Sequence, residues 1–194
     1  MPSLSSPLVA AVLAVALAAP AAHPPVHLIQ DRSERTSSLG LTRLLTVVPL
    51  PGRARFVAAE HFRKSIASEA RVRIAWIGRN FRRHFLSKIE ENVRPAEIGI
   101  HRLRRSARDA AIIDAIGERH ETDLAHLWAM LLRQPAGETG ALAVRGSANV
   151  FYIRAANGTL WAVDAVWGGA GWEIGASATD DPRPWRAGRV IISR

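Results

Sequence analysis

The chain has 194 residues, a hydrophobic content of 48% and a formal net charge of +9 at pH 7. These values are typical of a globular protein with one domain or a small pair, large enough to form a core without covalent cross-links. The absence of cysteine excludes disulfides, thiolate metal sites and cysteine nucleophiles. The charge is uneven, because residues 53–108 carry 15 Lys and Arg against 5 Asp and Glu.

Residues 1–22 contain an almost pure run of Ala, Val and Leu that begins at Pro7. Small residues recur near its end, as they do at a signal-peptidase cleavage site. The run is too short, and too interrupted at Pro20, to span a membrane. No Lys or Arg precedes it, which leaves an Ala-rich leader as the alternative. We therefore expect a signal peptide over 1–22 and a secreted or periplasmic protein without an integral membrane span, the alternative being a cytoplasmic protein.

Composition divides the rest of the chain into a linker and one domain. Residues 23–52 are rich in Pro, Ser and Arg, and their apolar patch at 39–50 contains Pro49, which stops it from continuing as a helix. We expect a linker there, with one short element on the main body. The remainder, 53–194, is predicted to be a single α+β domain in three parts: a basic segment at 53–105, an αα-hairpin at 106–134 and an antiparallel sheet at 141–194.

The basic segment is predicted to mix helix and strand. Apolar residues recur at helical spacing from Phe62 to Ile89, but this stripe turns by about 180° over its length. One straight helix cannot keep such a stripe on one face. We expect a helix at 59–70, a strand at 73–77 because RVRIAWI alternates, and a further ordered piece that ends at Ile89. A short strand is predicted at 97–103.

Two helices are predicted in the αα-hairpin segment. Ser106 and Asp109 approximate a capping box at the start of the first helix, which ends at Gly117. Thr122 is the expected cap of the second helix, which stops before Pro135. A connection of about five residues predicts an αα-hairpin whose apolar faces pack against the C-terminal sheet.

The C-terminal part is predicted to form an antiparallel meander. Two apolar runs, 150–155 and 159–167, are joined by Asn157-Gly158, a strong signal for a hairpin with a two-residue type I′ turn. Further strands are predicted at 172–179, 189–193 and, as an addition, 141–144.

The expected register of this hairpin decides which side chains share a face. It pairs Arg154 with Trp161, Tyr152 with Val163 and Phe151 with Asp164. Trp161 and Trp167 then share a face with Tyr152 and Arg154, opposite Phe151, Ile153 and Leu160. If helices cover the second face, the first is an aromatic surface suited to sugar rings or a protein partner; the alternative is that the rings are core. The candidate partner-binding residues are Tyr152, Arg154, Trp161, Trp167, Trp172 and Trp185.

A second candidate surface consists of arginines in the basic segment, interleaved with Phe81 and Phe85. Such a pattern is typical of nucleic-acid binding, of contact with an anionic surface, or of a solvated face. The candidate residues are Arg79, Arg82, Arg83, Arg102, Arg104, Arg105 and Arg108.

Motifs for catalysis are absent from the sequence, which contains no G-x-S-x-G elbow, P-loop or Rossmann fingerprint. His120 and His126 are six residues apart, so their rings would diverge on a helix rather than share a metal ion. We predict no catalytic residue, metal ligand or cofactor. Asp164 lies within an apolar strand, either buried with a partner or on the solvent face of an edge strand.

These patterns favour a non-catalytic, exported binding or structural protein that presents an aromatic sheet face to a glycan or protein surface. The alternative is an intracellular nucleic-acid-binding protein that uses the Arg-rich segment 79–108. An enzyme is the third possibility, because no motif supports one.

Overall fold

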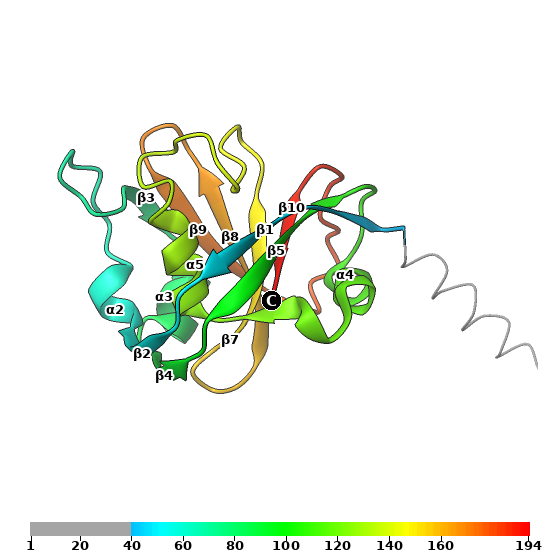
Figure 1. Ribbon diagram of the computed structural model, residues 1–194, viewed down its shortest axis with the longest axis horizontal. Coiled ribbons are helices and arrows are strands. Elements are labelled where there is room, and N and C mark those ends of the chain that lie inside the picture. The colour runs from blue at the N-terminus through cyan, green and yellow to red at the C-terminus, as the bar shows by residue number, and fades with distance from the viewer. Residues whose placement is uncertain (1–39) are drawn as a thin grey trace, which may run out of the picture.

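The computed structural model describes residues 40–194, which form an α+β fold built around one large mixed β-sheet (Figure 1). The predicted α+β class with a mostly antiparallel sheet is confirmed. The expected signal peptide at 1–22 lies outside the described residues.

The strands in chain order are β1 (Thr42–Leu50), β2 (Arg53–Val57), β3 (Ile74–Ile77), β4 (Ile89–Val93), β5 (Ala96–Leu103), β6 (Glu121–Thr122), β7 (Asn149–Arg154), β8 (Leu160–Trp167), β9 (Trp172–Ala178) and β10 (Val190–Ser193). The helices are α2 (Ala58–His61), α3 (Arg79–Phe85), α4 (Asp109–Ile116), α5 (Leu124–Leu131) and the 3-10 helix η1 (Gly117–His120).

The main sheet has the strand order β1-β5-β10-β7-β8-β9-β3, and β2 pairs with β4 in a separate ribbon. β7, β8 and β9 follow one another antiparallel. The chain then returns, so that β10 lies parallel to β7 and antiparallel to β5. β3 and the short β6 add further parallel pairs, with β9 and β7 respectively. The C-terminal strands are therefore part of a larger mixed sheet, whereas the sequence predicted an antiparallel sheet over 141–194.

The apolar patch where one short element was expected contains the edge strand β1, which pairs with β5 along its length. Pro49 excludes a helix, as predicted, but a proline is tolerated where a strand lies at the edge of a sheet. Its carbonyl accepts a hydrogen bond from Arg133 Nη2 at 2.9 Å. The short element expected on the main body is therefore the edge strand of the main sheet.

The basic segment is mixed, but its first helix is shorter than predicted. Only α2 is helical in the range 59–70, and the chain then forms a loop closed by a bridge between Ser65 and Ile74. The predicted strand at 73–77 is present as β3, and the strand at 97–103 as β5. Between them, α3 begins after Gly78 and β4 begins at Ile89.

The two predicted helices α4 and α5 exist but do not form a hairpin. η1 and β6 connect them, and β6 pairs with β7. α4 packs through Ile112 into a second core with Val150 and Tyr152, whereas α5 packs into the main core on the other face of the sheet. Figure 1 shows α5 on the left with α2 and α3, and α4 on the right. Because β6 lies between α4 and α5, the two helices are on opposite faces of the sheet instead of being joined by a short turn.

Neither helix uses its predicted cap. Residue 108 precedes the first turn of α4 without a side-chain cap, and Ser106 Oγ instead accepts a hydrogen bond from Ala187 N at 3.3 Å. The start of α5 is capped from β4, because the two carboxylate oxygens of Glu90 accept from Leu124 N and Ala125 N, each at 2.9 Å. Lys88 Nζ lies 2.8 Å from the same carboxylate, which compensates its buried charge.

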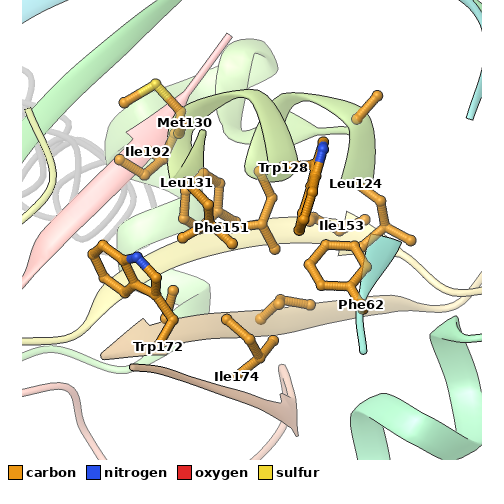
Figure 2. Packing of buried hydrophobic residues seen from close by; sticks show 14 of the residues in the cluster. Phe62, Leu124, Trp128, Met130, Leu131, Phe151, Ile153, Trp172, Ile174 and Ile192 are labelled. Carbon is orange, nitrogen blue, oxygen red and sulfur yellow. The ribbon is translucent and has the colours of Figure 1, made fainter. Parts of the chain in front are cut away.

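Alternate residues of the central strands point into the two cores, so both faces of the sheet are covered. The main core lies under α5, where Trp128 and Leu131 contact the layer formed by Phe151, Ile153 and Trp172 (Figure 2). Because both faces of the sheet are covered, the central strands carry apolar side chains on both faces.

The β7–β8 hairpin has a three-residue loop, 156–158, rather than the predicted two-residue turn. Ala155 N donates to Thr159 O at 2.8 Å, and Gly158 has φ 83°, which suits a loop that ends in a left-handed residue. The extra residue shifts the register by one, so that Ile153 lies opposite Trp161 and Tyr152 opposite Ala162. The predicted pairing is wrong, and Trp161 therefore shares a face with Ile153 rather than with Tyr152.

The last predicted strand, 141–144, does not form. The side chain of Asn149 takes the place of a strand partner for this segment. Its Oδ1 accepts from Ala143 N at 2.7 Å, and its Nδ2 donates to Ala143 O at 3.0 Å and to Ala165 O at 2.9 Å.

Candidate binding site

The six predicted partner-binding residues do not share one surface. Tyr152 and Trp172 are fully buried, on opposite faces of the sheet. Trp161 and Trp167 are partly buried against the main core. The Trp161 ring stacks on His84 with the centroids 4.4 Å apart.

Arg154 is exposed and lies opposite Leu160 rather than opposite Trp161. Its Nε instead lies 3.0 Å from Glu121 Oε2. Trp185, another member of the predicted set, lines a pocket.

The pocket is built around a buried carboxylate that sequence reasoning assigned to a helix cap. Asp109 in the first turn of α4 is 2% exposed, and its Oδ1 accepts two hydrogen bonds of 2.7 Å, from Tyr152 Oη and Trp185 Nε1. Burial raises the pKa of Asp109, and these two donors act against that rise. The carboxylate thus joins α4, β7 and the loop before β10.

The cavity beside Asp109 has a volume of about 270 Å³. It is lined by Asp109, Ser177, Asp181, Arg183, Pro184, Trp185, Arg186 and Arg189, which we call the Trp185 pocket. Asp181 is held in a two-point pair with Arg183, with Nε–Oδ1 and Nη2–Oδ2 distances of 3.0 and 2.7 Å. Hydrogen bonds from Arg183 lower the pKa of Asp181 to about 2. Both carboxylates of the pocket are therefore engaged by donors of the protein itself.

The loop after β5 lies beside the loop before β10, at the right of Figure 1. Leu103 N donates to Arg189 O at 2.9 Å, and Ala107 and Trp185 exchange backbone hydrogen bonds of 2.9 and 3.1 Å. This pairing brings the predicted basic residues Arg104, Arg105 and Arg108 next to the arginine-bearing loop of the pocket.

The other predicted arginines do not belong to this cluster. Arg79, Arg82 and Arg83 are exposed on α3, which packs against β9. Four strand spacings separate β9 from β5 in the sheet, a distance of about 20 Å. Arg102 lies within β5, with its partner Val190 on β10. The structure therefore divides the predicted basic surface into two.

Another carboxylate, the partly buried Asp164, lies on the central strand β8. It is opposite Val150 on one side and Gly175 on the other, so it does not occupy an edge strand. A Cβ at Gly175 would lie 2.5 Å from Asp164 Oδ1, so glycine leaves the space that the carboxylate fills. Burial raises the pKa of Asp164 to about 6, and the charge of Arg189, which lines the pocket, acts against that rise.

Sequence reasoning singled out Asp164 but missed the buried role of Asp109 and the three pocket arginines. The signal for the arginines was present, because Arg183, Arg186 and Arg189 flank Trp185 within seven residues. No local signal could have found the Asp109 site, since its donors come from residues 43 and 76 positions later in the chain.

The histidines and carboxylates of the described residues are not grouped as metal ligands. Within residues 40–194, no group of three or more His, Asp or Glu side chains is arranged to hold a metal. His120 Nδ1 lies 2.7 Å from Gly117 O, and His126 is buried with Nε2 3.3 Å from Arg94 O. None of the helices in this range has the length and apolar character needed to cross a membrane.

Comparisons of the chain with protein-family models, with curated proteins and with solved structures find no match.

Proposed function

We propose that this protein is a non-catalytic, exported binding protein that holds an acidic glycan in the Trp185 pocket. The observation that carries the proposal is the hydrogen bond of 2.7 Å from Trp185 Nε1 to Asp109, which fixes an indole ring at the wall of an arginine-rich cavity. The pocket replaces the sheet face as the contact surface, because Tyr152 and Trp172 are buried.

The chemistry of the lining suits a sugar acid. An indole ring offers a flat apolar face to the C–H groups of a pyranose, and a guanidinium group pairs with a carboxylate through two parallel hydrogen bonds. Asp109 and Asp181 already accept hydrogen bonds from the protein. Arg186 and Arg189 also line the cavity and add two positive charges to it. The net charge available to a ligand is therefore positive.

A matched pair of oligosaccharides tests this function. We expect a glucuronate-containing oligosaccharide to shift the indole N–H resonance of Trp185, and a neutral glucose oligosaccharide of equal length to bind much more weakly. Arg186→Ala should lower the affinity for the acidic oligosaccharide roughly tenfold, because one charge-assisted contact is lost. Arg55→Ala, on β2, is the control and should leave affinity unchanged. Equal binding of both sugars, or of both variants, would contradict the proposal.

Export is the part of the proposal that rests on residues 1–22. It is tested by the mature N-terminus after expression in a bacterial host. Cleavage near residues 18–22 supports export, whereas an intact Met1 on cytosolic protein contradicts it.

The second candidate is an intracellular nucleic-acid-binding protein. It is favoured by the position of Arg104, Arg105 and Arg108 beside the pocket loop, which gives one end of the sheet a basic surface. Each phosphate contact releases a counterion, so affinity for DNA or RNA should fall steeply with salt. Replacing Arg102, Arg104 and Arg105 together with Ala should reduce that slope by up to about three units. Salt-independent binding, or no retention of nucleic acid at low salt, excludes this candidate.

A further inference from the structure

A second pocket lies on the main-core side of the sheet, where α2 meets the loop that leads to β3. Its volume is about 310 Å³. We call it the His61 pocket; the lining residues that matter here are Glu60, His61, Arg63, Ser65, Arg71 and Trp128.

The loop 63–73 is fixed at both ends, which makes the pocket a defined feature. Ser65 and Ile74 exchange backbone hydrogen bonds of 2.9 and 2.8 Å, which close the base of the loop. Arg63 Nε donates to Ala59 O on α2 at 2.9 Å. Arg71, on the returning half of the loop, is exposed. Two guanidinium groups therefore line one small cavity.

Two of the lining residues, His61 and Trp128, belong to a stack of three rings. His61 lies between Phe56 and Trp128, with centroid distances of 4.6 and 5.0 Å and interplanar angles of 22° and 26°. Both faces of the imidazole are thus covered, and only its edge remains for hydrogen bonding. Arg53 Nη1 lies 3.4 Å from His61 Nε2.

The His61 imidazole keeps one N–H group that its contact with Arg53 does not use. Burial, followed by the charge of Arg53, lowers the pKa of His61, so the ring is neutral at pH 7. Because Arg53 can only donate, Nε2 is the acceptor and the proton of the neutral ring lies on Nδ1.

Trp128 supplies a second donor without a partner. The side chain is 3% exposed, and no acceptor within residues 40–194 bonds to its buried Nε1. Figure 2 shows this ring above Ile153 and beside Phe62, in the main core. Buried polar groups in native proteins are nearly always hydrogen-bonded, so this N–H, on a ring that lines the cavity, is a candidate donor for a ligand.

We propose that the His61 pocket is a separate binding site for a small organic carboxylate. The side chains that line it are rich in donors: the His61 ring, the Trp128 indole, the Ser65 hydroxyl and the guanidinium groups of Arg63 and Arg71. Glu60 is the one acidic side chain among those that line the cavity. This distribution disfavours a metal cation and favours an anion with two oxygens, which a guanidinium group binds through a two-point contact. The site is on the opposite face of the sheet from the Trp185 pocket and does not depend on the function proposed there.

Benzoate and benzamide are suitable probes, because they have nearly the same shape and differ in charge. In the ¹⁵N-labelled protein, we expect benzoate to shift the Trp128 indole N–H resonance in a saturable way and benzamide to leave it in place. The Trp185 indole resonance should not move, which separates this site from the Trp185 pocket. A benzamide shift as large as that of benzoate, or a Trp128 resonance that benzoate does not move, would overturn the proposal.

Two variants assign the contacts. Arg71→Gln should raise the dissociation constant of benzoate roughly tenfold through loss of the charged contact, and it should fold normally because Arg71 is exposed. His61→Phe keeps the ring stack but removes the Nδ1 donor, so it should also lower the affinity for benzoate. Arg145→Gln, an exposed arginine elsewhere, is the control. Unchanged affinity in Arg71→Gln contradicts the proposal, as does a Trp128 shift produced by inorganic phosphate but not by benzoate.

Discussion

Asp109 and Tyr152 are 43 residues apart in the chain, and a hydrogen bond of 2.7 Å joins the carboxylate of the first to the hydroxyl of the second. The bond ties the first turn of α4 to the central strand β7. Both side chains are almost fully buried, at 2% and 0% exposed. Trp185 Nε1 donates to the same carboxylate oxygen, so the contact between helix and strand also fixes one wall of the pocket.

Removing the hydroxyl should therefore destabilise the whole fold. We expect Tyr152→Phe to lower the free energy of unfolding by about 1.5–3 kcal/mol, because a buried carboxylate loses one of its two donors. The measurement is urea unfolding. As a control, Thr159→Val alters an exposed hydroxyl in the β7–β8 loop and should have little effect. If both variants unfold at the same urea concentration, the hydrogen bond between Tyr152 and Asp109 does not stabilise the fold by this amount.

The stability of the protein should depend on Asp164 between about pH 4 and pH 6. Burial raises the pKa of this carboxyl from 3.8 to about 6, so the folded state holds a proton that the unfolded state has already released. The unfolded state binds fewer protons in this window, and the group therefore makes stability fall as pH rises from 4 to 6, by about 2–3 kcal/mol in total.

Comparison with Asp164→Asn isolates this contribution from that of other carboxyl groups. The variant should lack the decline and should be more stable than the wild type at pH 7. Urea unfolding at pH 4, 5, 6 and 7 measures both curves. Parallel curves would mean that the carboxyl titrates normally in the folded protein.

The corrected register changes what is expected of the tryptophans. Phe151 and Trp161 now belong to the same face of the sheet, so truncation of either ring should remove core contacts. Phe151→Ala should cost about 3–5 kcal/mol through lost burial and the cavity left behind. Trp161→Ala should also destabilise, although less, because Trp161 is only partly buried. Thermal and urea unfolding of both variants checks this order. If Trp161→Ala is as stable as the wild type, the Trp161 ring does not contribute to the core and is again a candidate partner-binding residue.

Local patterns predicted the position of most elements but not their partners. The alternating run at 73–77 and the apolar runs of β7, β8 and β9 are strands, since a strand's side-chain period can be recognised within a few residues. Their register could not be derived in the same way. Asn157-Gly158 is compatible with a two-residue and with a three-residue loop, because glycine supplies the positive φ angle in both.

The arrangement of α4 and α5 depended on contacts between distant residues. A two-residue strand, β6, pairs with Tyr152 and Ile153 about thirty residues downstream and separates the helices. Nothing in the sequence of that connection distinguishes it from a simple turn. The same limit applies to the site, where Asp109 resembles a helix cap locally and acquires its buried role from Tyr152 and Trp185.

The most direct measurement of the central claim is the affinity of Trp185→Phe for the glucuronate-containing oligosaccharide. Phe cannot donate to Asp109, so the ring loses its anchor at the pocket wall, and its smaller face reduces stacking. Trp76→Phe is the matched control, because Trp76 is 52% exposed on β3, at the other edge of the sheet. We predict that affinity falls roughly tenfold or more in Trp185→Phe and stays at the wild-type value in Trp76→Phe. Equal affinities in the two variants would contradict the assignment of the Trp185 pocket as the binding site.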